Sequence, residues 1–242
     1  MAQLKAVIFG AIGTIAETSD IQRQAFNKAF AEAGLDWHWD IATYHDLLTI
    51  NGGQNRIRAY RDADPARADV TDELISQLHQ AKTAQFEELL ANIPLSPRPG
   101  VVELIDTCKK DNIQVAFCTS TSREHVNAIG AALSGLLPFD RFAQVVTIDR
   151  VAQPKPAPDA YVYCLAQLGI TADEAIAIED TPVSLSAAKT AGLTTIATPG
   201  ATVADRDFYA ADLIVPDLTN LTVENLSSLL AARWHQATYF SM

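Results

Sequence analysis

Hydroxyl, amine and carboxylate side chains follow short apolar runs of this chain in an order that suits phosphate chemistry. Thr119 and Ser120 come after one run, Lys155 stands between two prolines, and Glu179 and Asp180 come after another run. Hydroxyl groups, backbone N–H donors at a helix start and one lysine can together bind a phosphate. An adjacent acidic pair can hold Mg²⁺, which prefers carboxylate oxygens combined with substrate phosphate. The set predicts a phosphate site with a weak metal site beside it.

Each of these features also has a purely structural interpretation. Residues 119–121 are of the types that cap a helix, and a lysine flanked by prolines is typical of a solvated loop. Glu179 and Asp180 could do no more than complement the dipole of a following helix. The functional interpretation rests on the whole set, which occurs in order after successive apolar runs.

Apolar runs without polar alternation are typical of strands buried on both faces of a parallel sheet. Helical patterns long enough for crossover connections separate these runs. We therefore expect an α/β fold with a doubly wound parallel sheet, in which ligands bind beyond the carboxyl ends of the strands. The predicted strands are residues 6–9, 113–117, 144–148, 175–178, 194–197 and 213–215, and the predicted helices are residues 101–110, 124–133, 159–168 and 184–191.

Residues 19–91 interrupt this alternation with helical patterns. Two apolar stripes recur at helical spacing, one at Ile21, Ala25, Phe26, Ala29, Phe30 and Ala33, the other at Leu74, Ile75, Leu78, Phe86, Leu89 and Leu90. We expect a core domain made of residues 1–18 and 92–242, with residues 19–91 inserted as an all-helical domain.

The motifs, in this order, resemble the haloacid dehalogenase (HAD) superfamily of aspartyl-phosphate phosphatases. Thr119 matches the hydroxyl of its second motif, Lys155 the lysine of its third, and Glu179 with Asp180 its acidic fourth motif. The helical insertion is similar to the family's small cap domain. Within the superfamily the chain is most similar to CbbY-type sugar-bisphosphate phosphatases, which act on xylulose 1,5-bisphosphate. Residues 16–18, 23–26, 34–37, 52–53 and 56–57 carry that closer match.

The first motif departs from the family pattern Phe-Asp-x-Asp-Gly-Thr, because residues 9–14 read Phe-Gly-Ala-Ile-Gly-Thr. The resemblance implies that Gly10 replaces the nucleophilic aspartate and Ile12 replaces the general acid/base. Glycine supplies no nucleophile, and isoleucine neither gives nor takes a proton. We therefore expect catalysis to be impaired. Mg²⁺ binding should also be weakened, since the resemblance makes the first aspartate a metal ligand.

The resemblance also implies contacts with substrate. Glu17 occupies an acidic position of the CbbY subgroup, and Arg56 can still hold an anion. Gln22 stands where the subgroup has histidine, and Gln54 stands where it has lysine. Loss of that lysine would weaken binding of a second phosphate.

Composition limits the partners that we expect. With 18 Lys and Arg against 29 Asp and Glu, the formal net charge of −11 would repel nucleic acid. No apolar run approaches the roughly 18 residues of a membrane-spanning helix, so a membrane partner is not expected. The cysteines (Cys108, Cys118 and Cys164) have no metal-ligand spacing and favour a reducing, cytoplasmic location. A phosphorylated small molecule is the expected partner, and no organic cofactor is expected.

Three hypotheses about function remain open. The first is a non-catalytic member of the phosphatase family that binds a phosphorylated metabolite, or a protein, without turning it over. The second is an active hydrolase of a sugar phosphate or bisphosphate with an unorthodox first step. The third is a protein-interaction module, since aromatic residues are enriched at interfaces and occur at Trp37, Trp39 and residues 234–240. Packing within the protein is the alternative for these aromatic side chains.

Overall fold

The computed structural model describes residues 3–50, 52–200, 203 and 207–239, with side chains up to residue 233. The chain divides into two compact units. The larger contains the residues up to Glu17 and those from Leu95 onward, and the smaller contains Thr18–Pro94. Each unit has a hydrophobic core of its own. Within the described part of the chain, no helix is long and apolar enough to cross a membrane.

The larger unit is built on a six-stranded sheet in which all neighbouring strands are parallel. The spatial order of the strands is β3-β2-β1-β4-β5-β6, so β1 lies between β2 and β4. Every residue of β1 is buried, which explains its uninterrupted apolar sequence. The strands are β1 (Ala6–Phe9), β2 (Gln114–Cys118), β3 (Gln144–Val146), β4 (Ala175–Glu179), β5 (Thr194–Ala197) and β6 (Leu213–Ile214).

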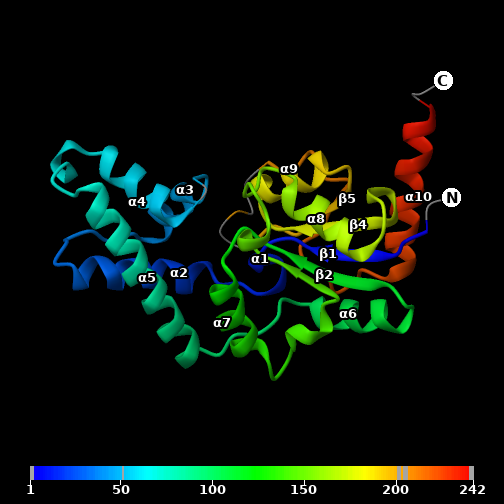
Figure 1. The fold of residues 1–242 in the computed structure, drawn as a ribbon, viewed down its shortest axis with the longest axis horizontal. Helices are drawn as coiled ribbons and strands as arrows, with labels where there is room; N and C mark the ends of the chain where they lie inside the picture. Colours follow the sequence, from blue (N-terminus) through cyan, green and yellow to red (C-terminus); the bar gives the residue numbers. More distant parts are fainter. Residues whose placement is uncertain (1–2, 51, 201–202, 204–206, 240–242) are drawn as a thin grey trace. The chain divides into compact units, whose positions relative to one another are not determined.

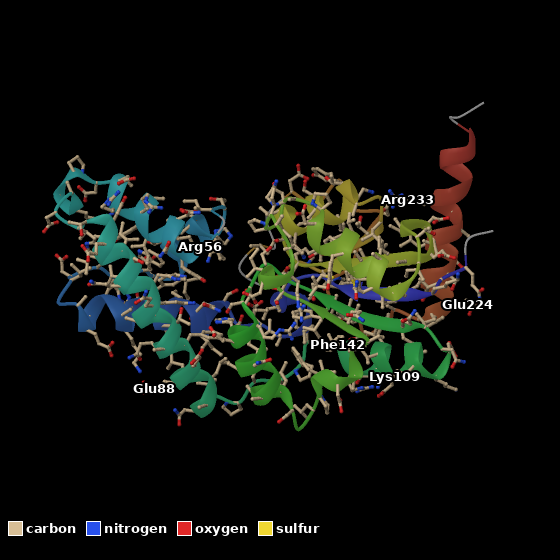
Figure 2. All side chains as sticks on the ribbon, in the orientation of Figure 1. Arg56, Glu88, Lys109, Phe142, Glu224 and Arg233 are labelled. Atoms are coloured by element: carbon tan, nitrogen blue, oxygen red, sulfur yellow. The ribbon has the colours of Figure 1, made fainter. Side chains whose placement is uncertain are left out.

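Helices cover both faces of this sheet (Figure 1). α6 (Val101–Lys110) and α7 (Arg123–Leu133) lie on one face, and α8 (Asp159–Leu168) and α9 (Pro182–Thr190) lie on the other. On the first face, Phe142 (labelled in Figure 2) packs edge-on against Phe9 with ring centroids 6.2 Å apart. The unit also contains α1 (Ile12–Ile15), α10 (Val223–Tyr239) and the 3-10 turns η2 (Phe139–Arg141), η3 (Ile148–Arg150) and η4 (Ala172–Glu174).

The doubly wound α/β sheet predicted from the sequence is confirmed. Strands 6–9 and 194–197 and helices 101–110 and 159–168 have the predicted bounds. The predicted strand 144–148 is too long, because it ends at Val146 and the turn η3 follows. At that turn Thr147 Oγ1 donates to Oδ2 of Asp149 at 3.1 Å, a local side-chain bond that favours a turn over a strand. The same carboxylate oxygen accepts the backbone N–H of Arg123 at 2.8 Å.

The regular elements described in the smaller unit are all helices. Its elements are α2 (Ser19–Glu32), α3 (Ile41–Leu47), α4 (Gly53–Asp62), η1 (Pro65–Arg67) and α5 (Asp72–Asn92). α2 and α5 pack against each other and bury Phe26, Phe30 and Leu78 from the two predicted stripes. Ala33 was expected in the first stripe but is exposed, because α2 ends before it and Ala33 forms the C-cap.

The two tryptophans considered for an interface belong to the core of the smaller unit. Trp37 is 8% exposed and Trp39 is fully buried. The Trp39 ring lies 4.6 Å from the ring of Phe26 and 4.9 Å from that of Phe30, measured between centroids. Their aromatic character is therefore explained by packing. The side chains of residues 234–239 and all of residue 240 lie outside the described residues.

Candidate functional site

The register of the sheet places three strand ends side by side. Phe9 of β1 is paired with Phe117 of β2 on one side and with Ile178 of β4 on the other. Gly10 continues this ladder, since its N–H donates to the carbonyl oxygen of Ile178 at 2.8 Å. Gly10 therefore lies beside Glu179, the last residue of β4, at the edge where parallel sheets bind ligands.

Lys155 is a buried cation at this edge, with a side chain that is 4% exposed. Its Nζ donates to the carbonyl oxygen of Cys118 at 3.1 Å, to the hydroxyl of Tyr161 at 2.7 Å and to Oε1 of Glu179 at 3.2 Å. The amine thus joins the ends of β2 and β4 to the first turn of α8. The interpretation of Lys155 as a solvated loop residue is wrong, because these polar partners replace water around its charge.

Thr119 and Ser120 lie directly after β2. The N–H of Thr119 donates to the carbonyl oxygen of Val146 at 2.9 Å, and its Oγ1 accepts the N–H of Thr121 at 3.2 Å. Ser120 Oγ accepts the backbone N–H of Lys155 at 3.0 Å. The structure therefore brings the two predicted hydroxyl residues together with the segment that carries the lysine.

The helix-cap interpretation of residues 119–121 is wrong. The following helix, α7, begins at Arg123, and its N-cap is Ser122. Ser122 Oγ accepts the N–H of His125 at 3.4 Å. The capping role thus falls to the next residue of the chain, and it does not account for the hydroxyls of Thr119 and Ser120.

Glu179 fills the space that the absence of a side chain leaves at Gly10. A Cβ atom built on Gly10 would overlap both carboxylate oxygens and the carboxyl carbon of Glu179. The Glu179 residue is 0% exposed. Its carboxyl group, which starts from the end of β4, therefore stands where the first side-chain atom of any other residue 10 would be.

Asp180 is also buried, and its environment favours the neutral form. Burial raises the pKa of Asp180 to about 7, and the neighbouring Glu179 charge adds to the rise while Lys155 opposes it. Burial likewise raises the pKa of Glu179 against the opposing charge of Lys155. Among the described residues, no hydrogen-bond partner reaches Oε2 of Glu179 or Oδ1 of Asp180. One lysine thus faces two buried carboxyl groups.

Ile12 and Glu17 flank the short helix α1 near this acidic pair. Ile12 is the first residue of α1 and is half-buried, whereas Glu17 follows the helix and is exposed. The charge of Glu17 is one of the smaller causes that raise the pKa of Asp180. Glu17 Oε2 lies 2.9 Å from the position that a Cβ atom on Gly200 would take. Glu17 therefore acts electrostatically on Asp180 from the surface of the same unit.

The smaller unit carries a cationic cluster of its own. Lys82 is 6% exposed, donates to Oε1 of Gln22, and lies 5.0 Å from the ring centroids of both Phe26 and Phe86. Burial, with a smaller contribution from the charge of Arg56, lowers the pKa of Lys82 to about 7. Burial, followed by Lys82 and Arg56, also lowers the pKa of His79.

Arg56 and Gln54 lie on α4, at the edge of this cluster. Arg56 is half-buried and donates from Nε to the carbonyl oxygen of Ile50 at 3.0 Å; Figure 2 labels it. Gln54 Nε2 donates to Ser76 Oγ at 3.2 Å. The charged form of Lys82 is disfavoured by burial and by the nearby arginine, and a bound anion would lower this electrostatic cost.

The comparison with known families agrees with these motifs. A model of haloacid dehalogenase-like hydrolases matches residues 4–192, which is most of the chain. The chain belongs to this family. It is 39% identical over 230 residues to the protein CbbY of Rhodobacter capsulatus, a match that covers 94% of this chain and 99% of that protein.

Solved structures of CbbY from Rhodobacter sphaeroides are similar to this HAD-like chain over the same extent. A complex with phosphate has a TM-score of 0.80 and 36% identity, and covers 90% of this chain and 96% of that one. An aspartate-to-asparagine variant in complex with xylulose 1,5-bisphosphate has a TM-score of 0.81 with the same identity and coverage. The chain is therefore a CbbY-like member of the HAD phosphatase family.

HAD phosphatases generally use Mg²⁺, and the acidic pair fits that ion in part. The two buried carboxylate oxygens without partners, one on Glu179 and one on Asp180, are donors of the type that Mg²⁺ takes. In the described part of the chain, no three His, Cys, Asp or Glu side chains are grouped as metal ligands. Mg²⁺ often relies on one or two carboxylates completed by water and phosphate, so weak binding at Glu179 and Asp180 stays an expectation.

Sequence reasoning missed three residues of these sites. Tyr161, a partner of Lys155, carries a hydroxyl on a buried helix face and so needed a hydrogen-bond partner. Lys82 stands four residues from both Leu78 and Phe86 on the apolar face of α5, a spacing that places it in the core. Arg98 gave only a weak signal, as a single cation between two prolines.

Proposed function

We propose that this HAD-like chain binds a phosphorylated small molecule and does not turn it over by the family mechanism. The observation that carries the proposal is the end of β1, where Gly10 and Ile12 supply no carboxyl group. The space at residue 10 is taken by the Glu179 carboxyl group, which lacks any exposed surface.

The expected loss of rate is large. A carboxylate at position 10 would attack phosphorus, and a second at position 12 would protonate the leaving oxygen. Positioned proton transfer is typically worth about 10²–10⁴ in rate. Loss of the nucleophile from a cooperating set can cost on the order of 10⁶. With neither group present, turnover by this route is expected to fall below detection in ordinary assays.

Glu179 is a poor replacement nucleophile. It is the carboxylate that stands closest to the lost side-chain position, but it is fully buried and one of its oxygens is paired with Lys155. In-line attack needs an accessible oxygen about 3–3.5 Å from phosphorus. This geometry disfavours the hypothesis of an active hydrolase with an unorthodox first step.

The groups that we expect to bind an anion are present at the strand ends. Lys155, Thr119 and Ser120 are gathered at the ends of β2 and β4. When bound at Glu179 and Asp180, Mg²⁺ would neutralise phosphate charge as a Lewis acid. The cationic cluster of Arg56 and Lys82 supplies a second set of anion contacts in the smaller unit. The phosphate and xylulose 1,5-bisphosphate complexes of similar CbbY proteins support a sugar phosphate or bisphosphate as ligand.

The test combines turnover and binding. Phosphate release from a panel of sugar mono- and bisphosphates with Mg²⁺ is measured for the parent and for a Gly10→Asp, Ile12→Asp double variant. We expect no release from the parent, and calorimetric binding of at least one panel compound by the parent. Turnover by the double variant, and its loss when Lys155→Met is added, would show that the rest of the site is competent.

Two results would overturn this proposal. Ordinary turnover by the parent would mean that another residue carries the first step. Failure of the parent to bind every compound in the panel would remove the binding function, whatever the double variant does.

A further inference from the structure

Glu179 and Lys155 form a closed ion pair at the predicted phosphate position. We infer that Glu179 is an internal anion that competes with external phosphate for Lys155, and that Gly10 makes this possible. The inference deepens the proposed function, on which it rests. The site would open to a phosphate or phosphate monoester when Glu179 leaves Lys155. The contact between Gly10 and Glu179 would then help to determine the affinity for phosphate.

Lys155 and Glu179 are in direct contact in the interior of the larger unit. Lys155 Nζ and Glu179 Oε1 are 3.2 Å apart, with side chains that are 4% and 0% exposed. The other donors of the amine go to the Cys118 carbonyl and the Tyr161 hydroxyl, which are neutral acceptors. Of these three acceptors, Glu179 is the one that carries a full negative charge. An incoming phosphate would have to share or take over this cation.

The position of the Glu179 carboxyl group depends on the absence of a side chain at Gly10. The Glu179 carboxyl group occupies the volume of a Cβ atom on Gly10, so the carboxyl position and a side chain at residue 10 exclude each other. Backbone atoms of β1 cannot move out of the way, because both edges of β1 are hydrogen-bonded to neighbouring strands. Any larger residue at position 10 must therefore displace the Glu179 side chain.

Phosphate can reach Lys155 only if the ion pair between Lys155 and Glu179 separates. Separating a buried ion pair leaves an uncompensated charge, which is costly unless a new partner takes its place. A phosphate dianion next to Lys155 would be such a partner for the amine, while Glu179 would have to turn away from it. The free energy of phosphate binding therefore includes the cost of moving Glu179 away from Lys155. Phosphate should bind more tightly to a variant in which this carboxylate is already absent from Lys155.

The experiment measures binding of inorganic phosphate by calorimetry in the presence of EDTA, so that metal binding does not enter. Glu179→Gln removes the charge, Glu179→Asp keeps the charge on a side chain one methylene shorter, and Gly10→Ala keeps Glu179 but blocks its position. We expect each of the three to bind phosphate about tenfold more tightly than the parent, equivalent to about 1.4 kcal/mol.

Matched controls separate this effect from general ones. Gly135→Ala makes the same substitution at an exposed glycine whose Cβ position is open space, and should leave phosphate affinity unchanged. Glu224→Gln removes an exposed charge on α10 (labelled in Figure 2) and should also have no effect. Thermal melting of each variant verifies that it is folded.

A tighter Kd for Glu179→Gln alone would overturn the inference, because simple repulsion between Glu179 and phosphate would then explain the gain. Equal Kd values in all variants, or no binding in any, would also overturn it. If Gly10→Ala does not fold, Glu179→Asp decides the matter, since it too keeps the charge. None of these results depends on turnover, so the proposed function can stand or fall separately.

Discussion

Arg98 Nη1 donates to the carbonyl oxygen of Gly13 at 2.8 Å, and this contact holds the short helix α1 that follows β1. The same guanidinium donates to the carbonyl oxygens of Thr198 at 2.8 Å and Pro199 at 3.0 Å, which follow β5. It also reaches the carbonyl oxygen of Pro216, after β6, at 3.3 Å. One planar cation thus holds together helix α1 and the segments that follow β5 and β6 at the carboxyl edge of the sheet.

Replacing Arg98 should destabilise the larger unit. Arg98→Ala removes several charge-assisted hydrogen bonds from partly buried carbonyl groups, so we expect a loss of about 2–3 kcal/mol. Arg98→Lys should recover only part of this loss, because an ammonium group cannot reproduce the planar fork. Denaturant unfolding measures both, with the exposed Arg150→Ala as control. Equal stability of the parent and Arg98→Ala would contradict the role assigned to Arg98.

Asp180 should make stability depend on pH. Its pKa is raised from 3.8 to about 7 by burial, so the folded state holds a proton that the unfolded state releases. This contribution to stability is complete below pH 3.8 and is lost as pH rises to about 7. The free energy of unfolding of the parent, minus that of Asp180→Asn, should therefore fall over this range and stay level above it.

Asp149 supplies a control whose contribution to stability should change with pH in the opposite direction. The N–H of Arg123 holds the pKa of Asp149 below its model-compound value of 3.8. The stability contribution of Asp149 is therefore present above that value and is lost as pH falls. Unfolding of Asp149→Asn should show this reversed trend. A flat difference for Asp180→Asn in the same buffers would mean that Asp180 is ionised at its usual pKa.

Lys82 should cost stability near neutral pH. Its pKa is lowered from 10.5 to about 7 by burial, so the charged form is disfavoured in the folded state. The cost is complete below pH 7 and vanishes as pH approaches 10.5. Lys82→Met should therefore be more stable than the parent at pH 6, and the gain should shrink by pH 10. Chemical denaturation at both pH values measures the difference.

The exposed Lys109, labelled in Figure 2 at the end of α6, provides the comparison for Lys82. Lys109→Met should have a small effect that is similar at both pH values. Phosphate should stabilise the parent more than Lys82→Met, since an anion near Lys82 relieves the cost of its burial. If the stability gain of Lys82→Met over the parent is smaller at pH 6 than at pH 10, burial does not disfavour the charged form of Lys82.

Gly10→Asp by itself should be destabilising. The new side chain and the Glu179 carboxyl group cannot occupy the same volume, and overpacking of this kind typically costs about 1–3 kcal/mol. Glu179→Ala should restore part of the loss when the two are combined. A double-mutant cycle on the free energy of unfolding measures the coupling. Additive effects would mean that Glu179 leaves the space freely.

The sheet could be predicted because its residues carry a local signal. Buried parallel strands such as β1 and β5 are short apolar runs, and these need no knowledge of their neighbours to be found. The strand predicted at 144–148 was too long because its end depends on Asp149 and Arg123, which are far apart in the sequence. Local pattern does not contain such a contact.

The candidate site was predictable in its residue types but not in its contacts. Lys155, Thr119 and Glu179 were found because motif order is a property of the chain. That Glu179 would cross from β4 into the space at Gly10 could not be predicted, since side-chain direction depends on the register of β1 with β4. Tyr161 was missed for a similar reason, because its partner is six residues away on another element.

The contact between Gly10 and Glu179 also has a consequence for redesign of the chain. An aspartate introduced at residue 10 meets a volume that the carboxyl group of Glu179 takes. The overlapping atoms are the far end of a flexible side chain, so a new rotamer of Glu179 can make room without movement of the backbone. The conformation of Glu179 is therefore a design variable in any attempt to build a catalytic carboxylate at the end of β1.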